Sequence, residues 1–289
     1  MWSRRKMALP KNQRKDFMEQ QHQQQPKPLG GGGGHGRFWD DVKYGYSLVR
    51  GTRHKMEDFH VAEFRRISSH EVGLFGIFDG HSGRSVARYL QRNLFENILH
   101  EPGFWENPLN SIINAYHSTD ENILEEARQL GTCGSTAVTV ILIDGLHLLV
   151  ANVGDSRALL CRGGTAIQLS VDHDPLRERD VIEKRGGFVT EKEGCVPRVD
   201  GRLAMSRSFG DLTMKGHLCA DPDIFEEWID EADKFIVLES DGISHVMRNQ
   251  EVIDLVRNYN DPRDAARALT QEAVARGSID DISTIVVYF

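Results

Sequence analysis

Short apolar runs separated by turn residues dominate the chain beyond Trp39. Several runs have the length and β-branched content of strands, namely 44–49, 72–78, 135–143, 147–153, 157–161, 234–238 and 282–289. Apolar residues recur at helical spacing over 85–99, 109–130, 176–185, 249–259 and 262–276. Gly163-Gly164 and Asp144-Gly145-Leu146 join successive runs as hairpin turns would. Consecutive hairpins, with helices grouped before and after them, predict an α+β fold with antiparallel sheets.

The first 37 residues have a different composition. They hold eight Lys or Arg and two acidic residues, a Gln-rich run at 20–25 and a glycine tract at 30–34. Such a segment offers too little apolar surface to offset its ordering entropy, so we expect residues 1–37 to form a disordered basic arm. A single folded domain is then expected over residues 38–289.

Composition excludes several classes of protein. The chain has 289 residues and a net charge of −8, which argues against a nucleic-acid-binding protein. Its longest apolar run, 137–143, is far shorter than a membrane span, and no apolar segment typical of a secretion signal follows the first basic residues. The four cysteines form no CxxC pair, which favours reduced thiols and an intracellular protein, in the cytoplasm, the nucleus or both.

Acidic residues stand at the ends of the predicted strands. Asp58 precedes the run 59–64, Asp79 follows the run 72–78, Asp241 follows 234–238, and Asp280 precedes the last strand. Carboxylates gathered at one rim would repel one another unless cations neutralise them. Oxygen ligands favour Mg²⁺ or Mn²⁺, although a single Asp at such a position more often forms a turn or a helix cap. Spacing alone therefore indicates a candidate divalent-metal site.

At these positions the chain resembles the protein phosphatase 2C family of metal-dependent Ser/Thr phosphatases, and plant members most closely. The resemblance spans about residues 44–289. It is carried in family order by Arg53-x-x-Met56-Glu57-Asp58, Phe75-Gly76-Ile77-Phe78-Asp79-Gly80-His81-Ser82-Gly83, Gly134-Ser135-Thr136-Ala137, Gly154-Asp155-Ser156-Arg157, Ser206-Arg207-Ser208-Phe209-Gly210-Asp211, Ser240-Asp241-Gly242 and Asp280-Asp281-Ile282-Ser283. It implies an α-β-β-α sandwich of two antiparallel sheets flanked by helices.

The resemblance also implies roles for single residues. It assigns two Mg²⁺ or Mn²⁺ ions to Asp58, Asp79, the carbonyl of Gly80, Asp241 and Asp280. Glu57 matches a carboxylate that holds metal-bound waters, and Arg53 matches the residue that binds the substrate phosphate. His81 matches the group that protonates the leaving oxygen. The implied reaction is direct attack of a metal-bridging water or hydroxide on phosphoserine or phosphothreonine, without a covalent intermediate.

One departure concerns a third metal. Members of the family commonly have Asp-Gly-x-Trp-Asp where this chain has Asp241-Gly242-Ile243-Ser244-His245. The second Asp of that pattern helps to hold a third, weakly bound ion together with the positions of Asp155 and Asp241. A histidine offers at best one neutral nitrogen, so the third site is in doubt while the two-metal core is not.

Two classes of function remain. The first is a metal-dependent protein phosphatase that acts on phosphoproteins as a monomer, with protein kinases as candidate partners. The second is a catalytically weak or inactive pseudophosphatase that serves as a binding or scaffold module in signalling. Loss of metal-binding aspartates would mark the second class, and all four are present. A cysteine-based phosphatase is excluded, since no cysteine has an arginine six positions later.

Overall fold

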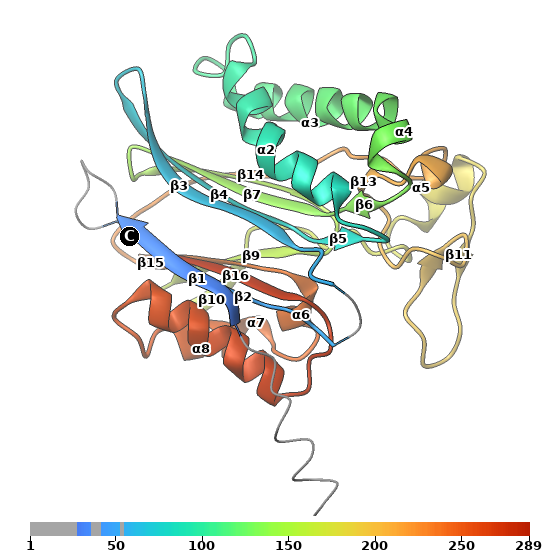
Figure 1. Ribbon diagram of the computed structural model, residues 1–289. Helices are drawn as coiled ribbons and strands as arrows, with labels where there is room; N and C mark the ends of the chain where they lie inside the picture. Colours follow the sequence, from blue (N-terminus) through green and yellow to red (C-terminus); the bar gives the residue numbers. More distant parts are fainter. Residues whose placement is uncertain (1–27, 36–41, 53–54) are drawn as a thin grey trace, which may run out of the picture.

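The structure is a computed structural model that describes residues 28–35, 42–52 and 55–289. Two antiparallel sheets lie face to face, and helices cover their outer faces (Figure 1). One sheet has six strands in the order β1-β2-β16-β15-β9-β10, and the other has five in the order β14-β8-β7-β4-β3. The four-layer α-β-β-α sandwich expected from the sequence is thus confirmed. Among the described residues, no helix is long and apolar enough to cross a membrane.

The strands follow the predicted runs closely. The six-stranded sheet consists of β1 (Pro28–His35), β2 (Lys43–Val49), β9 (Arg157–Arg162), β10 (Thr165–Gln168), β15 (Asp233–Glu239) and β16 (Ile282–Tyr288). The five-stranded sheet consists of β3 (Phe59–Ile67), β4 (His70–Phe78), β7 (Ala137–Ile143), β8 (His147–Val153) and β14 (Asp223–Trp228). Smaller pairings join β5 (Gly80–His81), β6 (Gly134–Ser135) and β13 (Phe209–Gly210), and also β11 (Val189–Thr190) and β12 (Arg198–Val199).

Helices pack on the two outer faces. α2 (Ser85–His100), α3 (Pro108–Glu125) and the short α4 (Ala127–Leu130) lie on the side of the five-stranded sheet. α7 (Asn249–Val256) and α8 (Pro262–Ala275) cover the six-stranded sheet. α5 (Arg179–Lys184), α6 (Asp241–Ser244) and the 3₁₀ helix η1 (Leu212–Met214) belong to connecting segments. The predicted helix 109–130 is divided into two, and the predicted helix 176–185 is shorter than expected.

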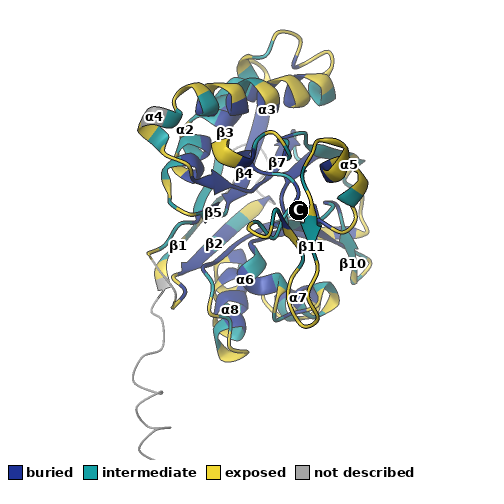
Figure 2. Cartoon of the chain, turned by 90° about the vertical axis from the view of Figure 1, so that its right-hand side faces the viewer, coloured by how far each residue is buried: buried dark blue, intermediate teal, exposed yellow. Residues whose placement is uncertain are grey.

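Three apolar layers hold the sandwich together. Leu74 and Leu90 belong to the layer between α2, α3 and the five-stranded sheet, whereas Phe75 belongs to the layer between the two sheets. Successive strand residues point to opposite faces, so a strand covered on both faces is apolar throughout. Val237 and Leu269 belong to the third layer, under α7 and α8. Figure 2 shows the buried faces of the helices turned toward the sheets.

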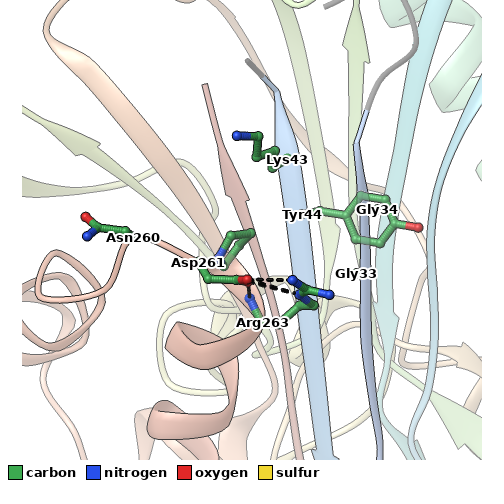
Figure 3. A pocket seen from close by; sticks show the side chains of 8 residues that line it. Gly33, Gly34, Lys43, Tyr44, Asn260, Asp261 and Arg263 are labelled. Atoms are coloured by element: carbon green, nitrogen blue, oxygen red, sulfur yellow. Dashed lines mark hydrogen bonds and ion pairs between the residues drawn. The ribbon is translucent and has the colours of Figure 1, made fainter. Parts of the chain in front are cut away.

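The glycine tract corrects one prediction. Residues 28–35 were expected to be disordered as part of the arm 1–37, but they form β1, the edge strand of the six-stranded sheet, which pairs along β2. A Cβ atom at Gly33 would lie 2.4 Å from the carbonyl oxygen of Tyr44 and 2.6 Å from Cγ of Arg263. The missing side chains, which suggested disorder, allow this strand to pass close to the start of α8 (Figure 3). The rest of the predicted arm, residues 1–27 and 36–37, lies outside the described residues.

Candidate metal centre

Strand pairing brings the four aspartates to one end of the sandwich. β3 and β4 are antiparallel with Phe59 opposite Phe78, so Asp58 and Asp79 lie side by side beyond this pair. β15 and β16 are antiparallel with Glu239 opposite Thr284, which places Asp241 and Asp280 beyond the same end of the other sheet. Ser283 of β16 donates a hydrogen bond of 2.7 Å to Oδ2 of Asp58 and so links the two groups.

Burial and mutual repulsion dominate the electrostatics of this cluster. Burial raises the pKa of Asp58 to about 7, although the Ser283 hydroxyl favours its charged form. Burial also raises the pKa of Asp79 well above 3.8, followed by repulsion from Asp58, Asp241, Asp155 and Asp280. The pKa of Asp155 rises to about 7, chiefly through burial and then through repulsion from Asp241. Ionising all of these carboxyl groups at the same time is therefore unfavourable unless a positive charge is bound among them.

The donor set fits a hard divalent cation. One carboxylate oxygen of Asp58 and one of Asp155 are buried and have no hydrogen-bond partner among the described residues. Within the described ranges, no three His, Cys, Asp or Glu side chains are arranged to hold a metal ion by themselves. Mg²⁺ keeps several waters when carboxylates bind it, so a shell completed by water suits these positions. The aspartates thus form an oxygen-rich cluster whose chemistry suits a hard divalent cation.

Two neighbouring residues shape the loop around the aspartates. The carboxylate of Glu57 accepts a hydrogen bond of 3.1 Å from the backbone amide of Gly83. Gly80 is buried, and a Cβ atom there would lie 2.6 Å from the carbonyl oxygen of Glu57, so only glycine fits at this position. Both positions adjoin the aspartates, and their roles toward a metal ion stay predictions.

Asp281 has a role that the sequence did not separate from that of Asp280. Its Oδ1 accepts from the amide of Gly51 at 2.7 Å, and its Oδ2 accepts from the amide of Glu57 at 2.8 Å. Asp281 is buried, and it joins the segment before β3 to the start of β16. The only signal in the sequence was the Asp-Asp pair at 280–281, which does not show which partners each carboxylate has.

His81 is held by a residue far away in the sequence. Its Nε2 lies 2.7 Å from Oδ2 of Asp211, while its Nδ1 is buried and has no partner among the described residues. The sequence named His81 but did not name Asp211 as its partner. Arg53, the expected phosphate-binding residue, lies outside the described residues.

His245 lies beside the aspartates expected to hold a third ion. Its Nδ1 is 3.5 Å from Oδ2 of Asp241, and its side chain is 59% exposed. When protonated, this imidazole offsets part of the repulsion that raises the pKa of Asp155, although burial and Asp241 outweigh it. The third site remains a prediction.

Sequence reasoning missed one buried carboxyl group. Glu239 ends β15, is fully buried, and neither of its side-chain oxygens has a hydrogen-bond partner among the described residues. Burial raises its pKa to about 8, against the opposing charge of Arg157. An acidic residue at the end of an apolar strand run was the available signal.

Comparison with known proteins agrees with this fold and site. The family model described as "Protein phosphatase 2C" matches residues 42–282, and the chain belongs to this family of metal-dependent Ser/Thr protein phosphatases. It is 54% identical to "Probable protein phosphatase 2C 20" of Arabidopsis thaliana, over 89% of either chain. It is 56% identical to "Probable protein phosphatase 2C 44" of Oryza sativa subsp. japonica, over 86% of this chain and 78% of the relative.

A solved structure confirms the fold. The serine-threonine phosphatase 2C from Toxoplasma gondii superimposes with a TM-score of 0.79 at 21% identity, covering 86% of this chain and 95% of that one. The plant relatives are named as phosphatases, which supports an enzyme over the scaffold alternative. The protein thus acts on phosphoproteins, as predicted.

Proposed function

We propose that this phosphatase uses two Mg²⁺ or Mn²⁺ ions, held by Asp58, Asp79, the carbonyl of Gly80, Asp241 and Asp280. The supporting observation is the convergence of buried and half-buried carboxylates from both sheets, with the pKa values of Asp58 and Asp79 raised. Such a cluster is costly without cations and binds them readily when it is ionised.

Each part of the chain has a separate task in this proposal. When bound, the ions polarise a phosphate oxygen and lower the pKa of a water molecule, which makes that water a nucleophile at neutral pH. Glu57 orients water beside the aspartates, Arg53 binds the phosphate, and His81 gives a proton to the leaving seryl or threonyl oxygen. Water attacks phosphorus directly, so no side chain becomes phosphorylated.

The experiment combines activity with metal binding. Hydrolysis of a phosphothreonine peptide is measured with Mn²⁺, with Mg²⁺ and after treatment with EDTA, and Mn²⁺ binding is measured by calorimetry. We expect activity only with metal and two strong sites, and we expect Asp79→Asn to lose both activity and at least one site. Asp264→Asn, which changes an exposed aspartate on α8, is the matched control. Full activity after chelation, or unchanged binding in Asp79→Asn, would contradict the proposal.

The location, oligomeric state and partners of the enzyme are further parts of this proposal. All four cysteines are free thiols, which supports an intracellular location, in the cytoplasm, the nucleus or both. We propose a monomer, with protein kinases among its partners. Gel filtration and co-purification with the intact chain test these two points, and a dimer at low micromolar concentration would contradict the first.

A further inference from the structure

A small three-stranded sheet lies next to the carboxylate cluster. β6 is its central strand, with β5 on one side and β13 on the other. Gly134 of β6 stands opposite His81 of β5 and opposite Gly210 of β13. Asp211 follows β13 directly, so this pairing brings Asp211 next to His81 although 130 positions separate them in the sequence.

Gly134 provides the space in which the two side chains meet. A Cβ atom at this position would lie 2.1 Å from Oδ2 of Asp211 and 2.3 Å from Nε2 of His81. The φ angle of Gly134 is not in the left-handed region, so its backbone conformation is open to other residues. Glycine is therefore required here for space, and the space is filled by the contact between His81 and Asp211.

The surrounding loop holds Asp211 in one orientation. Ser208 donates a hydrogen bond of 2.7 Å to Oδ2 of Asp211, and the amide of Asp211 donates to the carbonyl of Cys133 at 3.1 Å. Asp211 has φ of 50°, a left-handed conformation that is uncommon for a residue other than glycine. Such a conformation persists only where the surroundings enforce it, and it is frequent at functional sites.

A second set of contacts stabilises the same loop. The buried carboxylate of Asp120 accepts from the amide of Gly210 at 2.9 Å and from Nζ of Lys215 at 2.7 Å. Lys215 also donates to the carbonyl of Ser208 at 2.7 Å. The carboxylate that faces His81 is thus fixed from both ends of its loop.

We propose that Asp211 is the positioning residue of His81, and that Gly134 is the gap that allows the two side chains to meet. This inference rests on the proposed function, in which His81 protonates the leaving oxygen. A carboxylate that accepts Nε2–H fixes the ring and its tautomer, which leaves Nδ1 as the nitrogen that acts on the substrate. Nδ1 has no hydrogen-bond partner among the described residues, so it is the ring nitrogen that is left for the substrate.

The proton transfer in this step is balanced. The bond between phosphorus and the seryl or threonyl oxygen breaks, and the oxygen keeps the electron pair and takes the proton from Nδ1. The attacking water supplies the new oxygen on phosphorus, and the proton that it releases replaces the one lost by His81. Asp211 keeps its hydrogen bond to Nε2–H throughout and is not itself protonated.

The test compares two leaving groups. p-Nitrophenolate leaves with little help from an acid, whereas a seryl oxygen needs a proton. We expect Asp211→Ala to lower kcat for a phosphoserine peptide by about 10- to 100-fold, the effect typical of a residue that orients a functional group. The kcat for p-nitrophenyl phosphate should fall by less than about threefold. Gly134→Ala, which keeps both side chains and separates them, should give the same selective loss. Equal loss on both substrates would contradict the inference.

A double-mutant cycle separates positioning from a general structural role. In the His81→Ala background, Asp211→Ala should cause no further loss on the phosphoserine peptide, because both changes remove the same function. A further loss would contradict the inference. Ser208→Ala is the milder variant if Asp211→Ala does not fold, and it should give a smaller loss with the same selectivity. If Ser208→Ala lowers kcat equally for the phosphoserine peptide and for p-nitrophenyl phosphate, the inference is contradicted as well.

The chain contains a matched control pair. Asp144 also has a left-handed φ, of 51°, and its Oδ2 lies 2.5 Å from Nδ1 of His70. This pair lies at the start of β4, roughly 26 Å from the aspartates at its other end. Asp144→Asn should leave the ratio of the two kcat values unchanged. If Asp211→Ala shows no selective loss but the control variants still bind Mn²⁺ and need it for activity, only the role of Asp211 is contradicted and the proposed function stands. Activity without metal would contradict the proposed function itself.

Discussion

Burial of the Glu239 carboxyl group leads us to a quantitative prediction of how the free energy of unfolding depends on pH. In the folded protein its pKa is about 8, raised chiefly by burial from 4.5. The folded state therefore retains a proton that the unfolded chain releases above about pH 4.5. A group of this kind stabilises the fold below its unfolded pKa, and this contribution is lost as the pH rises toward the folded pKa. The stability of the metal-free protein should accordingly fall between about pH 4.5 and 8.

The substitution Glu239→Gln removes this dependence, because glutamine is uncharged in both states. Each pH unit above the unfolded pKa costs the wild type about 1.4 kcal/mol until the folded pKa is reached. At pH 7 the variant should be more stable by roughly 3 kcal/mol, and at pH 5 by less than about 1 kcal/mol. For a domain of this size the difference at pH 7 corresponds to a rise in Tm of about 6–10 °C.

The assay is urea or thermal unfolding of wild type and Glu239→Gln in EDTA, at pH 5, 6, 7 and 8. The difference between the two curves isolates this residue, since Asp58 and Asp155 contribute the same slope to both proteins. Glu231→Gln, which changes an exposed residue just before β15, should leave stability nearly unchanged. A constant difference between variant and wild type across this pH range would refute the reasoning.

Three further predictions concern the edge strand, the metals and His245. Deletion of residues 1–27 should leave Tm nearly unchanged, whereas deletion of residues 1–35 or the substitution Gly33→Val should lower it by several degrees, since β1 is lost or displaced; equal melting of all three would contradict the role of β1. Mn²⁺ should raise Tm more at pH 8 than at pH 5, because the aspartates bind metal in their ionised form; a shift independent of pH would contradict this. His245→Asp should add a weak metal site and raise turnover at millimolar metal, and an unchanged titration would remove His245 from the metal site.

Local pattern was sufficient for most strands and for the aspartates at the strand ends. A run such as 72–78 is apolar because it is covered on both faces, and an aspartate directly after it must lie at the end of a sheet. The strand β14 was not predicted, because its exposed positions, such as Glu226 and Trp228, interrupt the apolar pattern. The order of strands and charges indicated only a candidate divalent-metal site, and the set of ligands came from the resemblance to protein phosphatase 2C.

Periodicity and strand ends are local properties, so the amino-acid sequence was enough for the α+β class with antiparallel pairing and for the aspartates at the strand ends, while the arrangement in two sheets came from the resemblance to protein phosphatase 2C. The order of the glycine tract could be read only from the folded chain, since its pairing depends on β2 and on the space beside Arg263. The tertiary contacts also joined Asp211 to His81 and left the side chain of Glu239 buried with no hydrogen-bond partner in the part of the chain that the structure describes. These features depend on contacts between segments distant along the chain, and composition carries no information about which of them meet.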